Sequence, residues 1–133
     1  MQLDNTQYRI TAELSELKYL NEIEIVEMQF VTAIFSDKNG IPLIITSQNA
    51  AYNNANYNTE FSNNVKVIYL NNVLLSEKLN INFNENIIKV YENVVYEGIQ
   101  GTIKADNVIL NLIDKDMEIF MKNDKGKIEI TSK

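Results

Sequence analysis

Closely spaced carboxylates are the residues of this 133-residue sequence whose spacing most suggests catalysis. Asp114 with Asp116 and Glu22 with Glu24 are the closest pairs, and paired carboxylates are the groups with which glycosidases cleave a glycosidic bond. The first pair lies in a predicted turn and the second on the polar face of a predicted strand. Solvated surface charge explains both pairs, so we expect no catalytic residue and no enzymatic activity.

Metal and cofactor sites are also poorly supported. Asp114, Asp116 and Glu118 offer oxygen ligands for calcium, but they lack the glycine and the spacing of an EF-hand loop. The sequence contains no histidine and no cysteine, which excludes Ser-His-Asp and Cys-His catalysis and the usual zinc and copper sites. It has no glycine-rich phosphate loop, and its net charge of -6 disfavours nucleic acid. We expect no metal, no cofactor and no nucleic-acid partner.

The distribution of apolar residues predicts an all-β fold. The length and the 45% hydrophobic content are typical of one globular domain, here residues 1–133. Apolar and polar residues alternate at Leu79–Phe83, Ile88–Tyr91 and Val108–Leu112, and Asn-, Asp- and Gly-rich turns separate such runs. Thr11–Leu20 is the one helix candidate, but a strand is favoured there because Glu22–Ile25 alternates plainly.

An internal repeat organises these strands. Ile45, Leu74 and Ile103 are separated by 29 residues each, and a weaker copy begins near Ile10. The same step links Ser47, Ser76 and Ala105; Ala50, Leu79 and Val108; Tyr52, Ile81 and Leu110; Thr59, Ile88 and Met117; and Phe61, Val90 and Ile119. Each unit is a pair of strands that needs its neighbours to bury its apolar row. Stacked units form an elongated sandwich whose apolar seam is either a packed core or a partly open groove.

The repeat resembles that of the lipopolysaccharide-export (Lpt/OstA) β-jellyroll proteins, and of their LptC-like members most closely. The resemblance is carried by Ile45–Tyr52, a turn and Phe61–Val67, by the later copies Leu79–Tyr96 and Ile103–Met121, and by the opening Tyr8–Glu13. It covers roughly residues 8–121. The sequence departs from the family at Asn63 and Glu92, where a glycine often precedes Asn-Val.

The resemblance implies lipopolysaccharide transport across the periplasm, with the acyl chains held in the apolar interior of an elongated antiparallel β-jellyroll. The soluble bridge subunit LptA is an alternative within the family, and a structural or adhesive β-repeat protein with a solid core is an alternative outside it. The residues expected to face inward and to contact lipid are Val65, Val67, Leu79, Ile81, Phe83, Ile88, Val90, Val108, Leu110 and Leu112; Ile119 is expected to face inward beside them.

Partners are expected at both ends of the sheet, because the first and last strands leave backbone groups unpaired. The resemblance implies an LptA-like bridge protein at the C-terminal edge, contacted by Ile119, Phe120 and Met121, and the inner-membrane Lpt transporter at the N-terminal edge. Edge-to-edge association of copies is also expected, unless residues 122–133 cap the edge. No signal peptide or membrane anchor is evident in the sequence, so a segment missing here is expected to anchor the protein to the inner membrane.

Overall fold

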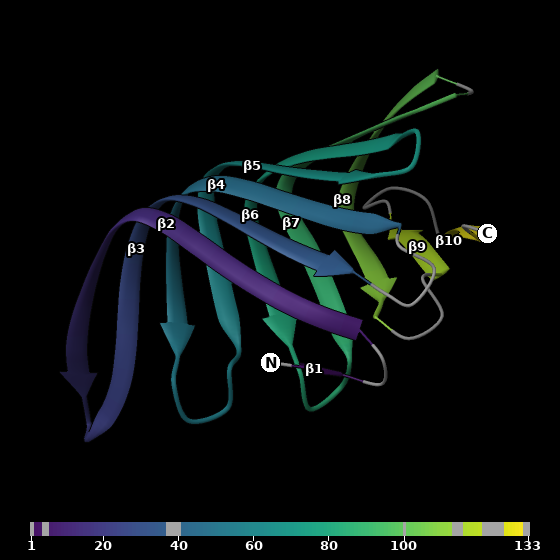
Figure 1. Cartoon of the computed structure of the whole chain (residues 1–133). Coiled ribbons are helices and arrows are strands. Elements are labelled where there is room, and N and C mark those ends of the chain that lie inside the picture. Colours follow the sequence, from purple (N-terminus) through teal and green to yellow (C-terminus); the bar gives the residue numbers. More distant parts are fainter. Residues whose placement is uncertain are drawn as a thin grey trace.

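The chain forms a single β sheet with no helix in the part that the structure describes (Figure 1). The computed structural model describes residues 2–3, 6–36, 41–99, 101–112, 116–120 and 127–131. Within these residues ten antiparallel strands follow one another in sequence order. Their bounds are β1 Gln2–Leu3, β2 Thr6–Leu20, β3 Ile23–Ser36, β4 Pro42–Asn53, β5 Thr59–Tyr69, β6 Asn72–Asn82, β7 Ile87–Gly98, β8 Gly101–Asn111, β9 Asp116–Phe120 and β10 Lys127–Thr131. The all-β prediction is confirmed, including a strand in place of the helix candidate Thr11–Leu20.

The long strands bend midway, so the sheet folds back on itself and encloses an apolar interior (Figure 1). In β5 the pair Asn63–Asn64 faces a single residue of β6, Glu77. In β7 the pair Glu92–Asn93 faces Asp106 of β8 alone. An extra residue of this kind is a β-bulge, which bends the strand and raises its twist. All four bulge residues have positive φ, between 55° and 69°, a conformation that glycine adopts without strain.

The strands next to β5, namely β4 and β6, turn the same corner without an extra residue, because the residues that face inward shift from one alternate set to the other at the bend. In β6 both Ser76 and Leu79 are buried, although they are three residues apart, and the two residues between them line the outside of the bend. Ser47 and Ala50 do the same in β4. Each serine stabilises its corner, because Ser47 Oγ donates to the carbonyl of Asn49 at 2.8 Å and Ser76 Oγ to that of Lys78 at 3.0 Å. The serine positions of the repeat therefore lie on one side of the corner, and the positions of Ala50 and Leu79 lie on the other.

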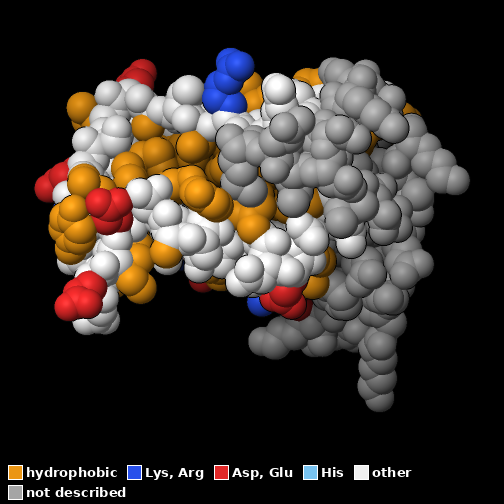
Figure 2. All heavy atoms as spheres, turned by 60° about the horizontal axis from the view of Figure 1, so that its bottom comes forward, with side chains coloured by type: hydrophobic (Ala, Val, Ile, Leu, Met, Phe, Trp, Pro, Cys, Tyr) orange, Lys and Arg blue, Asp and Glu red, His pale blue; other side chains and the backbone are white. Residues whose placement is uncertain are grey.

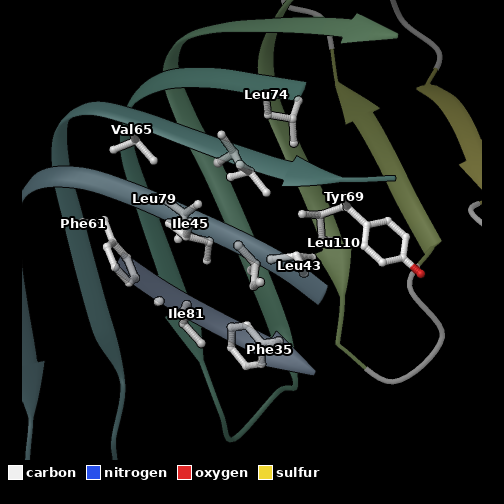
Figure 3. Close-up of a cluster of buried hydrophobic side chains, with 14 of the residues drawn as sticks. Phe35, Leu43, Ile45, Phe61, Val65, Tyr69, Leu74, Leu79, Ile81 and Leu110 are labelled. Carbon is white, nitrogen blue, oxygen red and sulfur yellow. The ribbon is translucent and has the colours of Figure 1, made fainter. Parts of the chain in front are cut away.

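The corner divides the sheet into two layers whose inner faces meet. The first layer contains residues 7–12, 31–36, 43–47, 65–69, 72–76, 94–98 and 101–105; the second contains 14–20, 23–28, 50–53, 59–62, 79–82, 87–91 and 108–112. In the second layer the strand register aligns one row, Tyr52, Thr59, Ile81, Ile88 and Leu110. The row brings together Tyr52, Ile81 and Leu110, which the repeat step of 29 residues links in the sequence. Figure 3 shows Ile81 and Leu79 pointing into the space between the layers.

The two ends of the sheet differ. Strand β1 pairs only with Thr6 and Gln7, so Tyr8–Leu20 of β2 has no described strand on its outer side. At the other end β10 pairs with β9 along its whole length. Strand β10 thus covers the outer side of the described part of β9, and the expected contact of Ile119, Phe120 and Met121 with a partner stays a prediction. The side chains of Ile119 and Phe120, and all of Met121, lie outside the described residues.

The bulges predict the effect of glycine at each position. Glu92 has φ 64°, which costs a residue with a Cβ roughly 1–2 kcal/mol. Glycine removes that cost but loses more entropy on folding, so we expect Glu92→Gly to raise the free energy of unfolding by about 0.5–1 kcal/mol. Asn63→Gly is the control and should change it little, because asparagine tolerates this conformation. Urea denaturation measures both. A loss of stability in Glu92→Gly would contradict the bulge geometry.

Candidate functional site

The residues predicted to contact lipid all lie on the inner faces of the layers. Every one except Phe83 is at most 5% exposed, and Leu79, Ile81, Ile88, Val90 and Val108 are completely buried. Phe83 is partly buried, and the side chains of Asn80, Asn82 and Asn111, expected on the opposite face, are partly exposed. The inward register is thus confirmed. Because these residues are buried between the layers, a ligand could reach them only if the two layers moved apart.

The interior opens toward the N-terminal edge of the sheet. The row of Tyr52 continues through Val26 of β3 to Leu17 of β2, since Tyr52 pairs with Val26 and Val26 with Leu17. Exposure rises along this row: Ile81 is completely buried, Val26 and Tyr52 are partly buried, and Leu17 is 52% exposed. We call Leu17, Tyr19, Val26, Tyr52 and Tyr57 the open strip. Figure 2 shows hydrophobic side chains gathered in a band on this open side.

Polar groups border the outer end of the open strip. Glu24 accepts a hydrogen bond from the Tyr19 hydroxyl at 3.1 Å and another from the Asn54 side-chain amide at 2.6 Å. Tyr52 and Tyr57 lie with their ring centroids 6.0 Å apart, which is the range of favourable aromatic contacts. The strip therefore combines an apolar floor with a satisfied polar rim, an arrangement suited to a ligand that has an apolar body.

Three aromatic rings close the interior where the open strip meets the packed core. Tyr8 stacks on Phe35 of the same layer, with centroids 4.5 Å apart. Phe83, just after β6 in the second layer, lies 5.4 Å from Tyr8 and 6.3 Å from Phe35. Its backbone N–H donates to Asn58 Oδ1 at 2.9 Å. Burial raises the pKa of Tyr8, so its hydroxyl stays protonated at neutral pH. These rings join the two layers across the seam.

The opposite face of the second layer carries both polar side chains and exposed apolar ones such as Leu20 and Ile23. A shallow hollow of about 600 Å³ there is lined by Glu16, Glu27 and Glu60, among other residues. Glu60 accepts hydrogen bonds from Asn80 at 2.6 Å and from Tyr91, and burial together with Glu60 raises the pKa of Tyr91. No group of three or more acidic residues in the described part of the chain could hold a metal ion. Glu60 therefore holds Asn80 and Tyr91 in place on the outer surface of the sheet.

The carboxylate pairs considered for catalysis gain no support. Glu22 lies in the β2–β3 turn rather than on a strand, and Glu24 is occupied by Tyr19 and Asn54. Asp114 lies outside the described residues, as do the side chains of Asp116 and Glu118. No catalytic pair is assembled from the side chains that the structure describes.

Sequence reasoning missed the open strip. Leu17 and Tyr19 lie in the segment with only rough periodicity, and Val26 was not singled out. The available signal was the weaker repeat copy beginning at Ile10. Its offset of 35 places Leu17 at the position of Tyr52, and the strand register confirms this equivalence.

An unclosed, strongly bent antiparallel sheet with an apolar interior defines a jellyroll-like fold class. The family model described as "Lipopolysaccharide-assembly, LptC-related" matches residues 2–128, nearly the whole chain, and the chain belongs to this LptC family. A search of curated proteins found no match. The family is a component of lipopolysaccharide transport and of the periplasmic bridge, and it is not a known enzyme family. Among the described residues there is no helix that could cross a membrane.

The difference in burial predicts that substitutions in the core lower the free energy of unfolding much more than substitutions in the open strip. Leu79→Ala removes a completely buried side chain and should lower the free energy of unfolding by about 2–5 kcal/mol. Leu17→Ala truncates the same residue type at an exposed site and should change it by less than about 0.5 kcal/mol. Urea denaturation of both variants checks the expectation. Equal losses would mean that Leu17 is a core residue and that the strip is closed in solution.

Proposed function

We propose that this protein carries the acyl chains of lipopolysaccharide along its apolar interior, as part of the bridge from the inner to the outer membrane. The exposed row from Leu17 through Val26 to Tyr52, continuous with the buried row beyond it, is the observation that carries the proposal. The family assignment supports it. In this proposal residues 1–133 act as one domain, and a segment outside this sequence holds the protein at the inner membrane.

Physical chemistry favours such a surface for transport. Burial of apolar area stabilises a bound chain by roughly 25 cal/mol per Å², without requiring directional contacts. A chain that slides along the row exchanges one apolar contact for a similar one, so the barrier between positions stays low. Such a function requires neither a nucleophile nor a cofactor. Val65, Val67, Leu79, Ile81, Phe83, Ile88, Val90, Val108, Leu110 and Leu112 would join the path when the layers separate.

The free edge of β2 is the proposed docking site for the inner-membrane Lpt transporter. Tyr8–Leu20 presents backbone donors and acceptors that no described strand pairs, and such an edge accepts a strand from another protein. An LptA-like bridge protein is proposed to bind at the C-terminal end through Ile119, Phe120 and Met121, beside β10, the last strand that the structure describes. Edge-to-edge pairing of two copies uses the same backbone groups.

A structural β-repeat protein with a solid core is the competing function. The complete burial of Ile81, Ile88 and Val90 is the observation that favours it, since a ligand gains nothing from a core that never opens. The two functions differ in one measurable property, which is the binding of an apolar molecule by the folded protein.

Leu17→Glu should abolish binding of a fluorescent apolar probe such as N-phenyl-1-naphthylamine. The carboxylate would lie on the floor of the open strip, where a bound probe would have to desolvate it. Leu20→Glu is the matched control, because Leu20 belongs to the same strand but faces the opposite side of the sheet and is 65% exposed. It should bind the probe like the unmodified protein. Circular dichroism establishes that both variants fold. Unchanged binding by folded Leu17→Glu would exclude the strip as the lipid path.

Proline substitutions at two successive residues test the docking edge. Successive backbone N–H groups of a strand point to opposite sides, and proline removes the N–H. Of Ser15→Pro and Glu16→Pro, one therefore deletes a donor on the free side of β2 and the other a donor toward β3. The first should fold normally and lose binding to the purified periplasmic domains of the transporter, measured by calorimetry. The second should lose stability. Full binding by both folded variants would rule out strand addition at β2.

A further inference from the structure

Tyr8 carries a buried hydroxyl whose hydrogen-bonding capacity is unused. Its side chain is 6% exposed, and its oxygen has no hydrogen-bond partner. Thr59 lies across the seam near enough to lower the pKa of Tyr8, but its hydroxyl donates to the carbonyl of Tyr57 at 3.0 Å. The Tyr8 hydroxyl itself makes no hydrogen bond in the structure. Tyr8 therefore carries an unused donor inside a largely apolar enclosure.

The other tyrosines of the interior and of the sheet show that this is unusual for the protein. Tyr96 is as buried as Tyr8, at 7% exposed, and its hydroxyl donates to Asn72 Oδ1 at 2.5 Å. Tyr91 donates to Glu60. A buried hydroxyl without a partner loses its hydration and gains nothing in return. A phenylalanine would fill the position of Tyr8 without that loss, so the hydroxyl has no evident structural role in the unliganded fold.

The position of Tyr8 connects this donor to the open strip. Its ring reaches from the first layer to Phe83 and Thr59 of the second. Phe83 donates its backbone N–H to the side chain of Asn58, which follows Tyr57 of the open strip, and Thr59 pairs with Tyr52 of the same strip. The inner end of the open strip thus lies beside the ring of Tyr8. A molecule that enters the interior from the strip would leave the polar rim behind and reach the buried Tyr8 hydroxyl.

We propose that the Tyr8 hydroxyl binds an acceptor oxygen at the head of an acyl chain, such as an ester or amide carbonyl, while the hydrocarbon lies on the open strip. This inference rests on the proposed function and adds to it the chemical class that is recognised and the residue that recognises it. The unpartnered donor fixes how far the chain enters, because the carbonyl stops at Tyr8. The aromatic rings of Phe35 and Phe83 shield the hydrogen bond from water, which strengthens it.

The test compares Tyr8→Phe with Tyr96→Phe in binding and in stability. Each change deletes one buried hydroxyl and keeps the ring. Two probes are used: N-phenyl-1-naphthylamine, which has no acceptor oxygen and is measured directly, and methyl tetradecanoate, which has an ester carbonyl and is measured by competition. We expect Tyr8→Phe to bind the ester about three- to tenfold more weakly and the naphthylamine with unchanged affinity. Its thermal midpoint should be unchanged or higher, because no hydrogen bond is lost.

Tyr96→Phe should give the opposite pattern, namely a lower thermal midpoint and an unchanged ratio of the two affinities. Equal ester affinity in Tyr8→Phe and in the unmodified protein would overturn the anchor and leave the apolar strip intact. Equal weakening of both probes in Tyr8→Phe would also overturn it, since the ring rather than the hydroxyl would then be responsible. If the unmodified protein bound neither probe, both the proposed function and this inference would fail.

Discussion

The corner in the strands is the constraint on which the other features of the molecule depend. A flat antiparallel sheet would expose one apolar face along its whole length. Here the bulges at Asn63–Asn64 and Glu92–Asn93 bend β5 and β7, and in β4 and β6 the inward-facing residues shift to the other alternate set at the same level. The inner faces of both layers are therefore apolar although each strand belongs to both layers. The interior, the aromatic closure and the open strip all follow from this bend.

The sequence predicted the strands and the inward residues because both depend on local alternation. Leu79, Ile81 and Leu110 follow a period of two, and such a period identifies one face of a strand. The corner was harder to predict, since its signal is an interruption of the period. Ser47 and Ala50 were recognised as repeat positions, but nothing in their identity shows that a bend lies between them.

The open strip was not predictable for a different reason. The type of a residue indicates whether its side chain favours an apolar environment. The exposed fraction of that side chain depends instead on how much of the sheet surrounds it. Leu17 and Ile81 occupy the same row and have similar chemistry, yet one is half exposed and the other completely buried. The difference arises because further strands flank β6 on both sides, whereas β2 lies next to the free edge. The position of a strand in the order of the sheet therefore decides whether its apolar residues stabilise the fold or remain available.

The repeat has a consequence for the length of the molecule. Each copy of 29 residues contributes two strands, and neighbouring strands lie about 4.7–4.9 Å apart, so each copy extends the sheet by roughly 9.5 Å. The strands of one copy pair only with each other and with those of the copies beside it, while contacts across the seam such as Tyr8 with Phe83 join copies further apart. Duplication of a hairpin would thus lengthen the interior in steps of fixed size. In an architecture of this kind the length of the apolar interior is set by the number of copies.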